Sequence, residues 1–451
     1  MFSFSLKVFC LDLKINVVIP QLIYMKKLLL LMTLIGFVNA YSQMDPSLKK
    51  DINAIEKDVI AWRHHFHQHP ELSNREFKTA EKIAQHLNSL GLEVKTNVAH
   101  TGVVALLKGD APGKTVALRA DIDALPVTER NDLPYKSEVT AEFLGTKTGV
   151  MHACGHDTHT AILMGVAEVL TKNKQLIKGN VKFIFQPAEE GPPPGERGGA
   201  SLMIEEGVLK NPDVDAIFGL HINSETPVGT INYKPGGTMA AVERFVINVK
   251  GKGSHGSKPW GGVDPILISA KIIDGLQTII SREAPLVKEP AVITVGKITS
   301  GTRFNVIPES AEMIGTVRTL DPDMKTMIIN RMTEMVSTIA KAYGGEAEIL
   351  FQNNTAITYN DLELTAAMLP TLKSIAGEDH VKLVKASTGG EDFSFFQEKV
   401  PGFYFFLGGM TPGNETPYPH HTPDFKIDDA GMLLGVKTLS QLAIDYLNKD
   451  M

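Results

Sequence analysis

Hydrophobic positions after residue 45 follow two different periods. In some segments they recur every three to four residues, as in amphipathic helices, and in others they form the short runs typical of strands. We expect helices at residues 48–69, 73–89, 160–171, 199–206, 264–282, 323–343, 361–375 and 428–447. We expect strands at residues 103–107, 115–119, 181–186, 216–221, 241–250, 291–298, 311–320, 347–352 and 402–407. Ser73-Asn74-Arg75-Glu76 fits a capping box that opens the second helix.

The order of these elements predicts the domain organisation. Strands and helices alternate up to residue 221, which favours an α/β sheet covered by helices. Residues 237–351 then carry four strands and two helices of a compact α+β unit, after which helix and strand resume. The simplest layout is an α/β domain formed by residues 45–236 and 352–451, split in the chain by a smaller inserted domain.

The N-terminal segment has the pattern of an export signal. Met25-Lys26-Lys27 precedes an apolar run, and Val38-Asn39-Ala40 fits a cleavage site. The run is short for a transmembrane helix, although a retained anchor is the alternative. We therefore predict a leader over residues 1–44, a true start at Met25, and a periplasmic or secreted protein without a membrane span after processing.

Charge and cysteine content narrow the function classes. With 45 Lys and Arg against 51 Asp and Glu, the net charge of −6 lacks the basic excess that nucleic-acid binding needs. The chain has two cysteines, Cys10 and Cys154, so a disulfide scaffold is excluded. Cleavage near Ala40 would leave Cys154 alone in an oxidising compartment, which predicts a protected or metal-bound thiolate.

Four segments at strand ends or in loops carry metal-binding chemistry. They are Met151–His159, Gln186–Glu190, Gly219–His221 and Pro419–Pro423. Together they supply a thiolate, imidazoles and carboxylates, and five such groups exceed one tetrahedral zinc, so a two-metal centre is expected. Thiolate and imidazole suit zinc, while the carboxylate also permits manganese, cobalt or nickel. Taken singly, each segment could instead be a polar helix cap, a solvated loop or a structural histidine.

These motifs resemble those of the M20 metallopeptidases. They match the amidohydrolase branch, which includes hippurate hydrolase, N-acetyl-diaminopimelate deacetylase and plant auxin-conjugate hydrolases. The similarity runs in matching order from Trp62 to His421 and is carried by Met151–Asp157, Gln186–Glu190, Gly219–His221, Gly253–Gly256, Thr302–Pro308, Gly389–Ser394 and His421–Pro423. It implies an α/β catalytic domain of zinc-exopeptidase type with an inserted lid that commonly dimerises.

The resemblance also assigns roles to individual residues. It implies that two divalent metals are held by Cys154, His156, Glu190, His221 and His421. Glu189 would be the general base that takes the proton of a metal-activated water and passes it to the leaving amine. His255, in the lid, would stabilise the oxyanion, often in the site of the partner subunit. Arg303 and Asn305 are predicted substrate or oxyanion contacts.

Other polar residues near these motifs receive supporting roles. We predict that Asp123 orients an imidazole from behind the metal ligands, while a ligand role for Asp121 stays open. The four histidines between His64 and His69 are interpreted as scaffold. Glu391 and Asp392 are expected to shape a turn and a helix start.

The leading hypothesis is a metal-dependent amidohydrolase that removes the acyl group from N-acyl amino acids. A dipeptidase or carboxypeptidase of the same superfamily is the nearer alternative. A catalytically silent binding protein on the same fold is the more distant one. Expected partners are a small N-acyl amino acid or short peptide, and further copies of the chain in a homodimer or higher homo-oligomer formed through the lid.

Overall fold

The computed structural model describes residues 44–414 and 416–449. The predicted signal segment, with Met25 and the cleavage site near Ala40, lies outside these residues. Within the described part of the chain, no helix is long and apolar enough to cross a membrane.

The larger of the two main sheets has eight strands and mixed direction. Its four neighbouring strands β6, β3, β7 and β18 run parallel, and antiparallel strands flank them. In spatial order the strands are β1 (Glu93–Val98), β2 (Gly102–Lys108), β6 (Lys178–Gln186), β3 (Ala111–Asp121), β7 (Ala216–Pro227), β18 (Gly402–Met410), β8 (Ile231–Tyr233) and β17 (Val381–Leu383).

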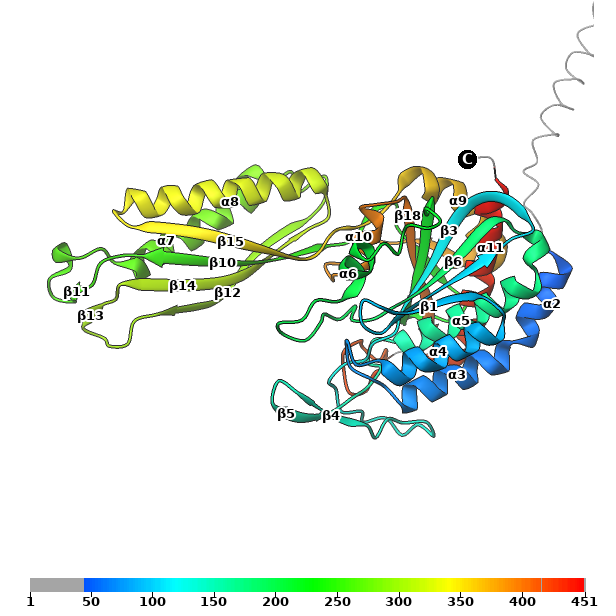
Figure 1. Ribbon diagram of the computed structural model, residues 1–451. Helices are drawn as coiled ribbons and strands as arrows, with labels where there is room; N and C mark the ends of the chain where they lie inside the picture. Colours follow the sequence, from blue (N-terminus) through cyan, green and yellow to red (C-terminus); the bar gives the residue numbers. More distant parts are fainter. Residues whose placement is uncertain (1–43, 415, 450–451) are drawn as a thin grey trace, which may run out of the picture. The chain divides into compact units, whose positions relative to one another are not determined.

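Helices cover both faces of this sheet (Figure 1). Alternate residues of β18 show why: Phe403 and Phe405 enter the larger apolar core, whereas Tyr404 enters a smaller one on the opposite face. The larger core is closed by α2 (Pro46–Ala54), α3 (Glu56–Gln68), α4 (Phe77–Ser89), α5 (His156–Lys172), α9 (Leu362–Ala376) and α11 (Met432–Asn448). The smaller core is closed by α6 (Gly199–Glu205) and α10 (Phe393–Gln397).

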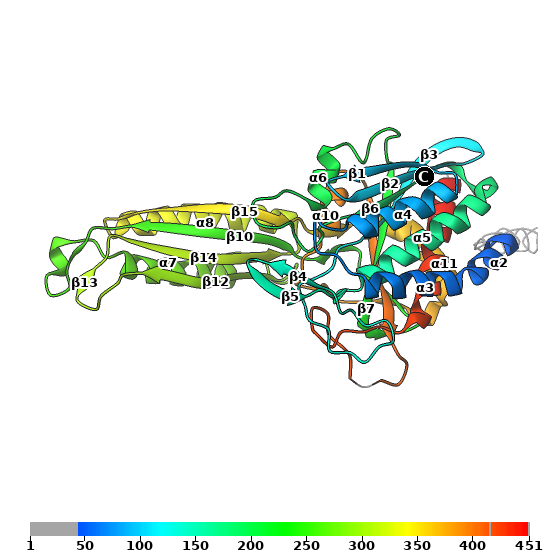
Figure 2. The ribbon, with the colours of Figure 1, turned by 60° about the horizontal axis from the view of Figure 1, so that its bottom comes forward.

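The second main sheet has four antiparallel strands and, together with two helices, forms the inserted unit that we call the lid. Its strands are β12 (Ala291–Ser300), β14 (Ser310–Thr319), β10 (Ala241–Lys250) and β15 (Glu346–Thr355). Helices α7 (Pro265–Thr278) and α8 (Pro322–Ala342) lie along one face, over the buried residues Phe245, Ile247 and Val249 of β10 (Figure 2). The sheet and helices of the predicted inserted unit are thus present, while the boundaries at residues 237 and 351 stay predictions.

Two details at the start of the described chain differ from the prediction. The helix expected over residues 48–69 is two helices, α2 and α3, which meet at the buried Ile55 and both pack apolar residues into the larger core. The capping box is wrong, because Ser73 and Glu76 bind distant partners and α4 begins only at Phe77.

Short strands account for most elements that the pattern did not predict. Besides β8 and β17 they are β4 (Thr140–Phe143), β5 (Thr146–Gly149), β9 (Gly236–Met239), β11 (Ser254–His255), β13 (Val306–Ile307) and β16 (Thr358–Asn360). The six-residue β1 was also missed, and most of its residues are exposed. A strand of two to four residues is too short for a period-2 pattern to stand out from a loop.

Candidate metal centre and active site

The predicted ligands meet at one edge of the eight-stranded sheet. Because β6, β3, β7 and β18 are parallel neighbours, their carboxyl ends lie at the same edge, where α/β sheets bind ligands. The side chains brought there are Cys154 and His156 at the start of α5, Glu189 and Glu190 after β6, His221 on β7, and His420 and His421 after β18.

A glycine makes the turn between Cys154 and His156 possible. Gly155 has φ +91°, a conformation that disfavours residues with a side chain, and an added Cβ would lie 2.3 Å from the Cγ2 atom of Ile222. The chain can therefore pass close to β7 and direct both neighbouring side chains toward the cluster.

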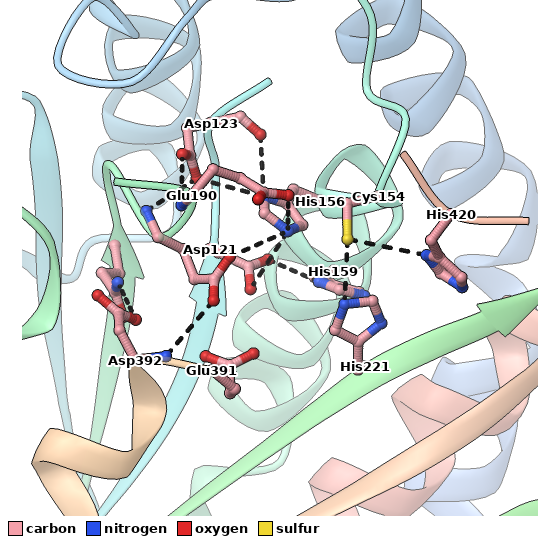
Figure 3. A network of polar contacts seen from close by, with 12 residues as sticks. Asp121, Asp123, Cys154, His156, His159, Glu190, His221, Glu391, Asp392 and His420 are labelled. Carbon is pink, nitrogen blue, oxygen red and sulfur yellow. Dashed lines mark hydrogen bonds and ion pairs between the residues drawn. The ribbon is translucent and has the colours of Figure 1, made fainter. Parts of the chain in front are cut away.

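The sulfur of Cys154 faces His221 and His420 (Figure 3). This Sγ atom is 3.3 Å from Nε2 of His221 and 3.2 Å from Nε2 of His421. The same nitrogen of His421 is 3.1 Å from Oε1 of Glu190, which lies 3.9 Å from Nε2 of His156. The structure therefore brings all five predicted ligands together.

The hydrogen bonds of the second ring nitrogen indicate which histidines can bind a metal. In His156, Nδ1 donates to the backbone oxygen of Asp123 at 2.9 Å, and in His221 it donates to that of Ile222 at 2.6 Å. Both rings therefore direct an Nε2 lone pair into the cluster. In His159, by contrast, Nδ1 donates to Asp121 and Nε2 accepts the backbone N–H of Ile222 at 2.8 Å, so neither nitrogen is free.

The cluster fits divalent cations. Nε2 of His156 is buried without a hydrogen-bond partner among the described residues, and Oε1 of Glu190 faces both His156 and His421. Two groups of possible ligands share Cys154, one with His156 and Glu190 and one with His221 and His420. Burial and the nearby carboxylates raise the pKa of the Cys154 thiol, an effect that a cation beside the sulfur would reverse.

Asp123 lies behind the ligands, where its predicted supporting role requires it. Its fully buried carboxylate accepts the backbone N–H groups of Glu189 and Glu190, both at 3.1 Å. It also accepts the Ser73 hydroxyl at 2.7 Å and lies 3.2 Å from Nδ1 of His156. One carboxylate thus orients a ligand ring and the turn that carries both glutamates.

Glu76 supports the same turn and was missed at the sequence level, where it was assigned to a capping box. Its carboxyl accepts the N–H of Ala188 at 3.0 Å and the Thr101 hydroxyl at 2.5 Å. Ala188 has φ +52°, which is unfavourable for a non-glycine residue and needs such external support. Burial and the nearby Asp123 raise the pKa of Glu76 to about 8.

We expect Glu76→Ala to lower kcat by about 100-fold, because a small displacement of a catalytic group has an effect of this order. Glu76→Gln should retain most of the activity, since the pKa of about 8 makes Glu76 largely neutral at pH 7 and the amide oxygen can still accept the Ala188 N–H. Steady-state kinetics of both variants test this. Wild-type kcat in Glu76→Ala would show that the turn does not need the carboxyl.

Glu189 lies beside the ligands and against a second acidic group. Its Oε2 atom is 3.8 Å from Nε2 of His156, and its Oε1 atom accepts the N–H of Asp392 at 3.4 Å. Burial and the neighbouring Glu391 raise its pKa well above the usual range for a carboxyl. Arg119 ion-pairs with both Glu391 and Asp392 at 3.0 Å and so holds the acidic group in place.

Comparison with known proteins identifies the family. The model of peptidase family M20/M25/M40 matches residues 117–445, more than half of the chain. The chain belongs to this family. It is therefore a metal-dependent hydrolase of amide bonds, and the predicted fold class, a split α/β domain with an inserted lid, is confirmed by the solved structures below.

The relatives of this M20 hydrolase are named as carboxypeptidases, deacetylases and other hydrolases. It is 43% identical over 404 residues to thermostable carboxypeptidase 2 of Saccharolobus solfataricus, covering 89% of this chain and 98% of that protein. It is 38% identical to an N-acetyl-L-cysteine deacetylase of Bacillus subtilis, covering 85% and 86%. A solved dinuclear metal-binding M20 peptidase of B. subtilis is 36% identical, with a TM-score of 0.72 and coverage of 88% and 99%. A putative aminohydrolase of methicillin-resistant Staphylococcus aureus, also 36% identical, has a TM-score of 0.83 and coverage of 90% and 100%.

In this M20 hydrolase a cavity of about 790 Å³ opens at the cluster. Its lining includes Cys154, Glu189, Glu190, His221 and His421. Arg318, on β14 of the lid, lines the same cavity and was not predicted. Its Nη1 atom is buried with no hydrogen-bond partner among the described residues, and burial lowers the pKa of the guanidinium. No sequence signal distinguished it, because a polar residue that alternates with buried ones on a strand usually faces solvent.

The structure does not bring the predicted lid residues to this cavity. His255 and Arg303 are exposed, Asn305 is partly buried, and none of the three is among the described residues that line the cavity. Nδ1 of His255 accepts the N–H of Ser257 at 3.0 Å, which places its proton on Nε2. The oxyanion role of His255 stays a prediction.

The histidine run in α3 lies outside the cluster. His67 is fully buried between Asp157, at 2.9 Å, and Glu129, at 3.2 Å. Arg63 also pairs with Asp157, at 3.1 Å, within the same buried network. These contacts agree with the interpretation of this segment as scaffold.

Proposed function

We propose that this M20 hydrolase removes the acyl group from N-acyl amino acids with the help of two divalent metals. The observation that carries the proposal is Nη1 of Arg318, a guanidinium nitrogen that is buried without a hydrogen-bond partner among the described residues and lies in the same cavity as Glu189. A buried guanidinium nitrogen without a partner is costly, and the carboxylate of an amino acid would satisfy it with a charge-assisted hydrogen bond.

The metal part of the proposal rests on the ligand set. Cys154, His156, Glu190, His221 and His421 would hold the ions, as the dinuclear peptidase at 36% identity supports. When bound, two divalent metals would supply an acidified water and a polarised amide carbonyl. Zinc suits the thiolate and imidazoles, and manganese, cobalt or nickel are the alternatives.

The protein's own groups perform the remaining steps. Arg318 would bind the substrate carboxylate and so set which amide faces the cluster. Glu189 would take a proton from water through one carboxylate oxygen and give it to the nitrogen of the leaving amine. Asp123 and Glu76 would hold the turn that carries Glu189 in position throughout.

The test is turnover of a substrate panel by purified protein loaded with each metal in turn. The panel holds N-acetyl, N-benzoyl and indoleacetyl amino acids, dipeptides, and one N-acyl amino acid amide that lacks the carboxylate. We expect turnover of N-acyl amino acids and little turnover of the amide control. Activity on dipeptides alone would favour the dipeptidase or carboxypeptidase alternative, to which the 43% identity to a carboxypeptidase lends weight. No turnover despite full metal loading would favour a silent binding protein.

Replacing Arg318 by Gln should raise KM for N-acyl amino acids by about 10- to 100-fold, because a hydrogen-bonded charge pair contributes about 1.5–3 kcal/mol. Turnover of the amide control should change little. Arg244→Gln is the matched control, because Arg244 lies on the neighbouring lid strand and hydrogen-bonds Gln352 outside the cavity. An equal loss on both substrates would contradict a carboxylate-binding role.

We also propose that the lid forms a homodimer in which His255, Asn305 and Arg303 reach the site of the partner subunit. The exposure of the lid tip supports this, since Trp260 is 82% and Phe304 96% exposed near His255. Mixing Glu189→Gln with His255→Ala chains after reversible dissociation should restore activity, because one heterodimer site then combines both intact residues. No recovery would place His255 in the site of its own chain.

Export is the last part of the proposal. The basic start at Met25, the apolar run and the Val38-Asn39-Ala40 site support cleavage near Ala40. The N-terminal sequence of the mature protein, isolated by cell fractionation, tests the cleavage site. A peptide of the uncleaved precursor that begins before Met25 would contradict the proposed start.

A further inference from the structure

Two adjacent histidines approach the sulfur of Cys154, yet only His421 was predicted as a ligand. Nε2 of His421 is 3.2 Å and Nδ1 of His420 is 3.7 Å from Sγ. The role of His420 is therefore open. Its ring nitrogen lies close enough to Cys154 and His221 for the three residues to bind one metal ion.

A backbone N–H group determines which ring nitrogen of His420 carries the proton. The N–H of Ser224 points to Nε2 of His420 at 3.2 Å, so that this nitrogen accepts and carries a lone pair. A neutral imidazole has one proton, which must then be on Nδ1, the nitrogen that faces Sγ (Figure 3). In this state Nδ1 of His420 has no lone pair for a metal.

His221 provides the contrast on the same sulfur. Its Nδ1 atom donates to the backbone oxygen of Ile222, so the Nε2 atom that faces Sγ at 3.3 Å carries a lone pair. The rings of His221 and His420 lie against each other, with centroids 5.2 Å apart. The ring of Phe425 packs against that of His420, with centroids 4.7 Å apart.

We propose that His420 is a positioning residue that donates an N–H···S hydrogen bond to the Cys154 thiolate and does not bind metal. The inference rests on the proposed metal centre. A hydrogen bond to a thiolate lowers the energy of the sulfur lone pairs. It also fixes the direction in which the sulfur faces the metal. Adjacent histidines thus have opposite functions, His421 as an electron-pair donor and His420 as a proton donor in a hydrogen bond.

The test is the sulfur-to-cobalt charge-transfer band of the cobalt-loaded protein. His420→Phe keeps a ring but removes the donor, so the band should move to longer wavelength while cobalt content stays at the wild-type value. His420→Asn places an amide N–H near the position of Nδ1 and should restore the wild-type band. Competition with a chelator should show about 10- to 100-fold weaker metal binding in His420→Phe, the usual effect of losing such a partner.

Three results would overturn the inference. An unchanged band in fully loaded His420→Phe would show that the hydrogen bond is absent. Loss of one cobalt per chain in that variant would make His420 a ligand. A wild-type protein without any sulfur band, checked against Cys154→Ser, would remove the thiolate from the metal and with it the role of His420. The band requires no substrate, so failure of the substrate panel with a normal band shift would reject only the proposed substrate.

Discussion

Glu189→Gln is expected to lower kcat by about 100- to 10,000-fold while the protein keeps its metal. The amide has nearly the same size and can still accept the Asp392 N–H, but it cannot take a proton from water, and general-base catalysis contributes an effect of this order. Glu189 is not among the predicted ligands, so the metal content should not fall. Steady-state kinetics and elemental analysis of the same preparation measure both quantities.

The adjacent glutamate provides the matched control. Glu190→Gln is the same chemical change one residue later, at a carboxylate whose Oε1 atom faces both His156 and His421. It should lose metal together with activity. If the two variants behaved alike, or if Glu189→Gln kept near-normal turnover with full metal, the assignment of the base would be wrong.

Cys154→Ala is expected to lose bound metal and at least about 100-fold of activity. The sulfur belongs to both groups of possible ligands, so its removal should weaken both positions. Elemental analysis after dialysis against a weak chelator measures the loss.

Folding must be separated from metal binding in this experiment. Cys154 is 7% exposed, and serine preserves the shape of the side chain while providing a poorer ligand. Cys154→Ser should therefore retain the circular dichroism spectrum of the wild type and still bind less metal. Unchanged metal stoichiometry in both variants would exclude the thiolate from the centre.

The sequence predicted the fold well where a segment is long and has a clear period. Strand β10 begins and ends at the predicted residues, and the long helix α8 is shifted by only one residue. Strands of two to four residues were missed because they carry too little pattern. Tertiary contacts overrode local signals at Ile55, and at Ser73 and Glu76, where buried partners replaced the expected cap.

The residues of the candidate site also fall into those that the sequence predicted and those that it did not. Cys154, His156, Glu190, His221 and His421 were found because each lies in a compact motif that resembles those of the M20 metallopeptidases, and these motifs lie at strand ends, a helix start or a loop of the α/β domain. Arg318, Glu76 and His420 were missed because their significance depends on what faces them in space. The missing partner of one buried guanidinium nitrogen and the tautomer of an imidazole are properties of the fold, and neither leaves a local pattern in the sequence.

The central claim is that Cys154 and its neighbours hold two metal ions beside Glu189. Anomalous diffraction from crystals of the zinc-loaded protein, collected on both sides of the zinc absorption edge, tests it most directly. We expect two zinc peaks per chain at the cluster, with Cys154 Sγ about 2.3 Å from a peak and His156, Glu190, His221 and His421 completing the ligands. A single peak, peaks elsewhere, or a peak that Cys154 does not contact would contradict it.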